Sequence, residues 1–159
     1  MGRFLGALLT ILILDQASKH VVLYELGLLT EPDGEILVLP PYLQFRMAWN
    51  TGINFGLFGS EVDAMRWILI AVALVISAVL TVWALRTGGW RVPILAGVVV
   101  GGALGNVWDR IVYGAVADFL NMSCCGIRNP YAFNVADIAI FVGALGLVLF
   151  AGPTDKKQA

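Results

Sequence analysis

The chain has 159 residues and a formal net charge of −1; 59% of the residues are hydrophobic, 13% are charged, and the mean hydropathy is +0.84. Soluble domains carry about 25% charged residues, so this composition excludes an ordinary soluble domain and predicts an integral membrane protein. The net charge excludes a global basic field for nucleic acid, and the length allows one compact domain, which we expect to cover residues 1–159.

The first apolar segment covers about residues 3–24 and predicts a transmembrane helix. It begins like a secretory signal, with Arg3 before an apolar run, but polar residues follow at once and the cleavage pattern is weak, so we expect it to be retained. Asp15 and Lys19 are four residues apart with the acid first, the favourable order for an ion pair on one helix face. Two interpretations stay open: the pair reaches the membrane interface, or it faces the bundle interior and braces a site.

A β-region is predicted over about residues 36–58. Ile36 to Leu39 is an apolar β-like run that ends at Pro40-Pro41. From Leu43 to Trp49, apolar and polar residues alternate with a period of two, which predicts a strand with one apolar face. We expect this region to lie on the bilayer surface and to clasp a substrate. Asn50-Thr51-Gly52 then ends the strand, and taken alone Asn50 is interpreted as a turn residue.

Three further apolar segments predict helices over about residues 61–86, 93–112 and 134–151. The first of these follows Ser60, a residue typical of a helix N-cap, and is long enough to cross a hydrocarbon core of about 30 Å. In the segment 93–112, glycine recurs every four residues. Such a stripe lets another helix approach closely, and we interpret it as helix packing.

Loop charges predict how these helices are oriented in the membrane. The basic residues of the termini and of the loop after the second helix lie on one side of a four-helix topology, whereas the loops on the other side are mainly acidic. Because the positive side is cytoplasmic, we expect both termini inside. The predicted fold class is therefore an all-α membrane protein with four transmembrane helices, N-in and C-in, and a small extracytoplasmic β-region between helices 1 and 2.

The polar residues of the apolar segments gather at one level, near the outer interface. Asp118 lies just past the end of the third helix, and Asp137 lies just inside the fourth. Two carboxylates close together in a low dielectric share one proton. The ionised member can take a proton from water and the neutral member can donate to a scissile carbonyl oxygen. This pair therefore predicts an intramembrane aspartyl peptidase that needs neither a metal nor a cofactor.

Other interpretations of the same residues stay open. Asn134 and Asp137 have the spacing of a capping box, and Asp118 can pair with Arg110 or Arg128. Membrane carboxylates also serve as proton relays, so a small proton-coupled carrier is the alternative function. Such a carrier needs a continuous polar path to the cytoplasm. A noncatalytic scaffold held together by the glycine stripes is a further alternative.

Five sequence blocks, in order, resemble the signature of the lipoprotein signal peptidase (signal peptidase II) family. They are Asp15-Gln16-Ala17-Ser18-Lys19, Asn50-Thr51-Gly52, Gly105-Asn106-Val107-Trp108-Asp109-Arg110, Gly114-Ala115-Val116-Ala117-Asp118-Phe119 and Phe133-Asn134-Val135-Ala136-Asp137. The blocks cover all four expected helices and the outer region. The resemblance implies an aspartic endopeptidase of the bacterial cytoplasmic (inner) membrane, with its active site near the periplasmic face and a small β-cradle outside the membrane.

The resemblance also implies a substrate and a set of site residues. The enzyme would remove signal peptides from prolipoproteins, cutting before a cysteine that carries diacylglycerol, and would bind the inhibitor globomycin between its aspartates. We expect a monomer in contact with membrane lipid and with no nucleic acid partner. The implied catalytic residues are Asp118 and Asp137. The residues implied to line or support the site are Asp15, Lys19, Asn50, Gly52, Asn106, Arg110, Asn134 and Ala136.

Two features depart from the family pattern. Ile53-Asn54 stands where the family commonly has two small residues, which affects the expected shape of the outer loop. Cys124 and Cys125 are adjacent, so they provide neither a disulfide framework nor metal-ligand spacing. We interpret them as free thiols, with a vicinal disulfide as the alternative, and assign them no role.

Overall fold

The computed structural model describes residues 1–52, 62–124, 126 and 129–151. Four α-helices and three strands make up this part of the chain. The helix bounds lie within two residues of the prediction when the π-helical turn that continues α1 is counted with it. The Ser60 cap and Ile53-Asn54 lie outside the described residues. In chain order the elements are α1 (Gly2–His20) with a π-helical turn (Val21–Glu25), β1 (Glu35–Leu39), β2 (Leu43–Asn50), α2 (Val62–Arg86), α3 (Arg91–Tyr113), β3 (Val116–Met122) and α4 (Val135–Phe150).

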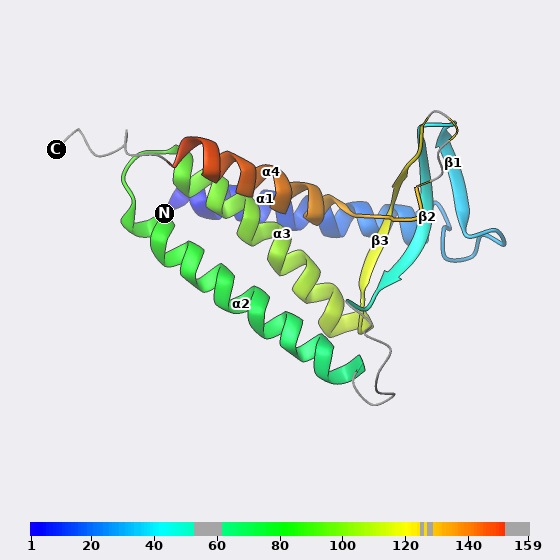
Figure 1. Cartoon of the computed structure of the whole chain (residues 1–159), viewed down its shortest axis with the longest axis horizontal. Coiled ribbons are helices and arrows are strands. Elements are labelled where there is room, and N and C mark those ends of the chain that lie inside the picture. The colour runs from blue at the N-terminus through cyan, green and yellow to red at the C-terminus, as the bar shows by residue number, and fades with distance from the viewer. Residues whose placement is uncertain (53–61, 125, 127–128, 152–159) are drawn as a thin grey trace.

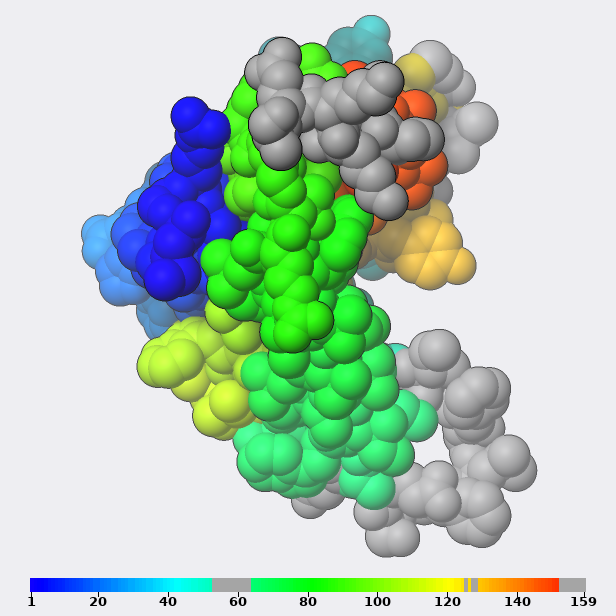
Figure 2. All heavy atoms as spheres, turned by 90° about the vertical axis from the view of Figure 1, so that its left-hand side faces the viewer, coloured from blue at the N-terminus to red at the C-terminus, as the bar shows by residue number. Residues whose placement is uncertain are grey.

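The helices run along the long axis of the molecule, and the sheet closes one end of it (Figure 1). The start of α1 and the end of α4 both lie at the opposite end, seen end-on in Figure 2 with the green of the α2–α3 region between them. Helix α3 packs against α1, α2 and α4. The apolar core at this end combines side chains from all four helices: Phe4, Ala84, Val92, Ala96, Val99, Val100 and Leu147.

Glycines of α3 let the neighbouring helices come close, as the stripe predicts. A Cβ at Gly97 would lie 2.5 Å from the carbonyl oxygen of Phe4, and one at Gly101 would lie 2.6 Å from that of Leu8. On the other side of α3, a Cβ at Gly102 would lie 2.6 Å from the Ala136 carbonyl oxygen. The helix-packing interpretation of the stripe is confirmed.

Three helical segments are long and apolar enough to cross a membrane: Gly2–Glu25, Ala64–Arg86 and Arg91–Tyr113. Helix α4 is also apolar but has 16 residues, which at about 1.5 Å per residue is shorter than a hydrocarbon core of about 30 Å. The fourth crossing and the orientation in the membrane stay predictions.

The sheet contains a strand that the sequence did not predict. Its order is β1-β2-β3, all antiparallel, so β3 from the α3–α4 connection joins the hairpin that precedes α2. The prediction of a β-region only between helices 1 and 2 is therefore incomplete, and Asp118 lies on a strand rather than in a loop. All four residues from Val116 to Phe119 are buried, so β3 lacks the polar–apolar alternation that marks a half-exposed strand.

The sheet is attached to the helices by a second apolar cluster. Val22 and Leu23 of the π-helical turn pack with Ala117 and Phe119 of β3. The predicted apolar face of β2 supplies Phe45 and Met47 to this cluster. The cluster packs β3, the strand that carries Asp118, against the π-helical turn at the end of α1.

Cys124 is disulfide-bonded. The free-thiol interpretation is therefore wrong for Cys124. Cys125 lies outside the described residues.

Candidate active site

Five elements bring polar side chains together beneath the sheet. The end of α1, the end of α3, the end of β2, the middle of β3 and the start of α4 all meet there. The buried polar side chains of the described residues gather at this end of the molecule, with Ser77 of α2 as the exception. Most of them form two hydrogen-bonded groups, one around Asp118 and Asp137 and one around Lys19, whereas Asn121 of β3 donates to the backbone of Asn129 and Tyr131.

Two asparagines hold the carboxylates of Asp118 and Asp137. The Asn134 side-chain amide donates to Asp118 Oδ1 at 2.7 Å, and its backbone N–H donates to Asp137 Oδ2 at 3.2 Å. The Asn106 amide donates to Asp137 Oδ1 at 2.9 Å, and its carbonyl oxygen accepts from the Asn134 amide at 3.1 Å. The two carboxylates are therefore linked through one residue, Asn134, that contacts both.

The capping interpretation of Asp137 is also correct. Asn134 is the N-cap of α4 and its side chain accepts a bond from the Asp137 N–H at 2.9 Å, so a complete capping box is present. The cap fixes where α4 begins and holds the Asp137 carboxylate at the helix end. Asp118 is only 2% exposed, whereas Asp137 is half-buried, so the two carboxyl groups have different environments.

Asn50 is more than a turn residue. Its side-chain oxygen accepts the Gly52 N–H at 3.0 Å, which makes the turn, and its amide donates to Asp118 Oδ2 at 3.1 Å. Gly52 has a φ of 97°, a conformation that favours glycine, and a Cβ there would lie 2.6 Å from Leu69 Cδ1. The turn therefore directs the Asn50 amide to the carboxylate.

Burial and charge give Asp118 an unusual acidity. Burial, and after it the nearby charge of Asp137, raise the pKa of Asp118 to about 7. Hydrogen bonds from Asn50 and Asn134 and the positive charge of Lys19 lower it, but by less. A carboxyl group that titrates near neutral pH can both hold and release a proton, which is typical of an acid–base group.

Lys19 lies between two buried carboxylates. Its Nζ is 2.7 Å from Asp15 Oδ2 and 2.7 Å from Asp109 Oδ2, and none of the three side chains is more than 5% exposed. Of the two interpretations of the Asp15–Lys19 pair, the one facing the bundle interior is confirmed and the interface pair is wrong. The second partner, Asp109, had no predicted role, because only the packing of α1 against α3 shows that it faces Lys19.

The Lys19 group also contacts the backbone next to each carboxylate of the pair. Asp15 Oδ1 accepts the Ala136 N–H at 3.0 Å, and Asp109 Oδ2 accepts the Ala117 N–H at 3.1 Å. Ala136 is fully buried, so its contribution to the site is this N–H and the space that its small side chain leaves.

Arg110 is half-buried near the carboxylates. Its Nη1 donates to the backbone carbonyl oxygen of Asn106 at 3.4 Å, and its buried Nε has no hydrogen-bond partner among the described residues. Within that part of the chain it forms no ion pair with Asp118, so that alternative is wrong. Arg128 lies outside the described residues.

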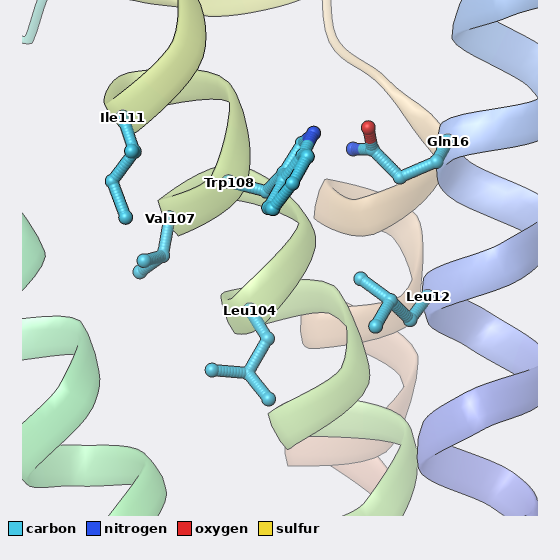
Figure 3. A pocket seen from close by; sticks show the side chains of 6 residues that line it. All are labelled: Leu12, Gln16, Leu104, Val107, Trp108 and Ile111. Atoms are coloured by element: carbon cyan, nitrogen blue, oxygen red, sulfur yellow. The ribbon is translucent and has the colours of Figure 1, made fainter.

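An apolar pocket of about 500 Å³ lies between α1 and α3 (Figure 3). Gln16 is the polar residue of its lining, and it extends from α1 toward Trp108 of α3. The Gln16 amide donates to Asp15 Oδ2 and to Asp109 Oδ1, both at 3.0 Å. The pocket lining carries no acid or base, so the candidate active site is the carboxylate pair.

Comparison with known proteins assigns the chain to a family. The family model described as Signal peptidase (SPase) II matches residues 7–151. The chain belongs to the signal peptidase II family. The resemblance inferred from the five sequence blocks is thereby confirmed.

Curated members of the signal peptidase II family match nearly the whole chain. A lipoprotein signal peptidase of Methylorubrum extorquens is 44% identical over 144 residues, covering 90% of this chain and 81% of that protein. One of Pseudomonas putida is 42% identical over 165 residues, covering 99% and 94%. Family membership makes this chain a multi-pass membrane peptidase, and hence a hydrolase.

A solved structure titled as a bacterial membrane enzyme at 1.9 Å resolution has the same fold. It matches with a TM-score of 0.79 and 19% sequence identity, and the match covers 96% of this chain and 94% of that one. At this identity the likeness shows the fold alone. It supports the bundle with a small sheet that holds the site of this signal peptidase II family member.

Proposed function

We propose that the protein is an aspartic endopeptidase that removes signal peptides from diacylglyceryl-modified prolipoproteins, cutting before the lipidated cysteine. The observation that carries the proposal is the link between Asp118 and Asp137 through Asn134, which holds two carboxyl groups beneath the sheet in different environments. Membership of the signal peptidase II family supports the substrate class.

The proposed reaction uses one proton shared by the pair. Asp137 takes a proton from a water molecule, whose oxygen forms a bond to the scissile carbonyl carbon, while Asp118 gives its proton to the carbonyl oxygen. The hydroxyl of the tetrahedral intermediate then returns a proton to Asp118, Asp137 protonates the departing amide nitrogen, and the C–N bond breaks. Burial of Asp118, which raises its pKa to about 7, supports its assignment as the protonated member of the pair.

The surroundings of the pair suit a membrane-anchored peptide. Asn50 and Gly52 place a strand end beside Asp118, and we assign β2 and this turn to holding the extended peptide. Arg110, whose buried Nε has no hydrogen-bond partner among the described residues, is assigned to a substrate carbonyl or to the same position in globomycin. We further propose four membrane crossings, with both termini in the cytoplasm and the site at the periplasmic face. This orientation is supported by the start of α1 and the end of α4, which both lie at the opposite end of the molecule from the sheet (Figure 1).

The proton-coupled carrier is not favoured. It requires a polar path away from the pair to the other end of the molecule. Among the described residues, that end is packed with apolar side chains, and Ser77 of α2 is the one buried polar side chain that lies away from the sheet end.

A cleavage assay tests the proposal. The purified protein in detergent is incubated with a diacylglyceryl-modified prolipoprotein and, separately, with the same protein lacking the lipid. We expect mass spectrometry to show cleavage of the lipidated form alone, at the bond before the modified cysteine, and we expect globomycin to stop it. Equal cleavage of both forms would contradict the proposed substrate class, and no cleavage of either form would contradict the proposed activity.

The rate should depend on pH through Asp118. Because its pKa is raised to about 7, the pair keeps its shared proton below that pH and loses it above. We therefore expect kcat to decline as the pH rises through about 7, measured between pH 5.5 and 9 on one lipidated substrate. A kcat that stays constant up to pH 9 would contradict the assignment.

Asn50 offers a control for this assignment. Its hydrogen bond favours the ionised form of Asp118 and lowers its pKa. Asn50→Ala should therefore move the alkaline decline to higher pH, whatever its effect on the maximal rate. A shift to lower pH would show that another group controls the profile.

A further inference from the structure

We propose that Asp109 is a positioning residue, and that Asp15, Gln16, Lys19 and Asp109 form a clamp that sets the separation of the two catalytic carboxyl groups. This inference rests on the proposed function, because it concerns the same pair. Gln16 and Asp109 have no role in the site as proposed above.

The clamp makes the same kind of hydrogen bond next to each aspartate of the catalytic pair. Asp109 accepts the N–H of Ala117, the residue immediately before Asp118, and Asp15 accepts the N–H of Ala136, the residue immediately before Asp137. Lys19 contacts both clamp carboxylates at 2.7 Å. The backbone N–H that precedes each catalytic carboxyl group is thus bound by a carboxylate of the clamp. Lys19 contacts both of these clamp carboxylates.

Gln16 forms the second link. Its amide donates to Asp15 and to Asp109 at 3.0 Å each, and it is further oriented by the Gly105 carbonyl oxygen at 3.4 Å. Gly105 itself leaves the space that the clamp needs, because a Cβ there would lie 2.6 Å from Asp15 Oδ2. The clamp is therefore built into the contact between α1 and α3.

The position of the clamp explains why the pair needs it. Asp118 lies on a strand and Asp137 lies on a helix, so no single element fixes their separation. The clamp joins β3 to α4 through residues of α1 and α3. Asp15, Lys19 and Asp109 are buried, and a buried polar network whose members are hydrogen-bonded to one another is rigid. Because a misplacement of about 1 Å can cost about 10²-fold in rate, a change in the clamp should act on the chemical step.

Asp109→Asn tests this role with little change in shape, although it removes one negative charge from the group around Lys19. Lys19 keeps Asp15 as its counterion, so the variant can fold. The amide has one oxygen where the carboxylate had two, so it cannot accept from Ala117, Lys19 and Gln16 together. We expect kcat to fall by about 10- to 100-fold, KM for the lipidated substrate to stay within about twofold, and the melting temperature to change little.

A matched control separates positioning from stability. Val92 is 1% exposed in the apolar core at the far end of the molecule. Val92→Ala leaves a cavity, so it should lower the melting temperature while kcat of the folded enzyme stays at the parent value. Asp109→Asn should show the opposite pattern. A parent-like kcat in folded Asp109→Asn overturns the proposal.

A second variant and a reference variant complete the test. If Asp109→Asn does not fold, Gln16→Met removes one of the two links without removing a charge, and we expect a several-fold loss of kcat at constant KM; a parent-like kcat overturns the proposal.

Asp118→Asn is the reference for the proposed function. If that variant cleaves at the parent rate, the catalytic pair is wrong, whereas a parent-like Asp109→Asn beside an inactive Asp118→Asn rejects the clamp alone.

Discussion

Asp118→Asn is expected to abolish cleavage and to leave the protein folded. The asparagine side chain has nearly the same shape, but it cannot give a proton to the scissile carbonyl oxygen. General acid–base groups contribute about 10²–10⁴-fold each, so we expect a loss of at least about 10²-fold in the single-turnover rate on a lipidated prolipoprotein. Asp137→Asn should cause a loss of the same order, because each carboxyl group needs the other.

The control for this prediction is the same substitution at an exposed aspartate. Asp33 lies in the turn before β1 and is exposed, so Asp33→Asn should cleave at the parent rate. Gel filtration and melting in detergent check that all variants are folded. Full activity in either Asp118→Asn or Asp137→Asn would falsify the catalytic pair.

The second large effect is expected on stability, in Lys19→Met. The methionine leaves Asp15 and Asp109, both fully buried, next to each other without a cation. Breaking a buried ion pair by removing one partner costs about 3–5 kcal/mol, a large part of the 5–15 kcal/mol that is typical of whole proteins. We therefore expect a strongly lowered melting temperature and poor recovery of folded protein, measured by tryptophan fluorescence in detergent.

An exposed ion pair gives the matched comparison. Arg46 lies 3.4 Å from Glu35 on the sheet, with side chains that are 47% and 32% exposed. Arg46→Met should cost less than about 1 kcal/mol, because water screens this pair. Adding Asp109→Asn to Lys19→Met removes one of the stranded carboxylates and should recover part of the stability. If Lys19→Met melts like the parent, Lys19 is not the counterion of this group.

The helices and the first two strands follow from local sequence patterns. Long apolar runs mark α1, α2, α3 and α4, and three of these segments are long and apolar enough to cross a membrane. Alternation marks β2, because one of its faces packs on Phe119 and its neighbours while the other is more open. Strand β3 has no such pattern, because from Val116 to Phe119 it is buried on both faces.

The candidate site could likewise be predicted only in part. Asp118 and Asp137 could be proposed as a pair from the sequence, because a carboxylate beside an apolar segment is costly unless it has a role. Asn50 looked like a turn residue, since its bond to Asp118 joins residues that are 68 positions apart. Asp109 lacked a role for the same reason: its partners on α1 become neighbours only when α1 and α3 pack. Contacts of this kind leave no mark in the local sequence.

The bond between Asp15 and Ala136 joins residues that are 121 positions apart. Since the chain is made from its N-terminus, α1 is synthesised before α4. The Asp15 carboxylate can therefore accept the Ala136 N–H only after the last helix has been made. A partly synthesised or partly inserted chain accordingly lacks a working hydrolytic centre. The proposed catalytic pair is thus complete only after α4, the last helix of the chain, has been made and has packed against α1 and α3.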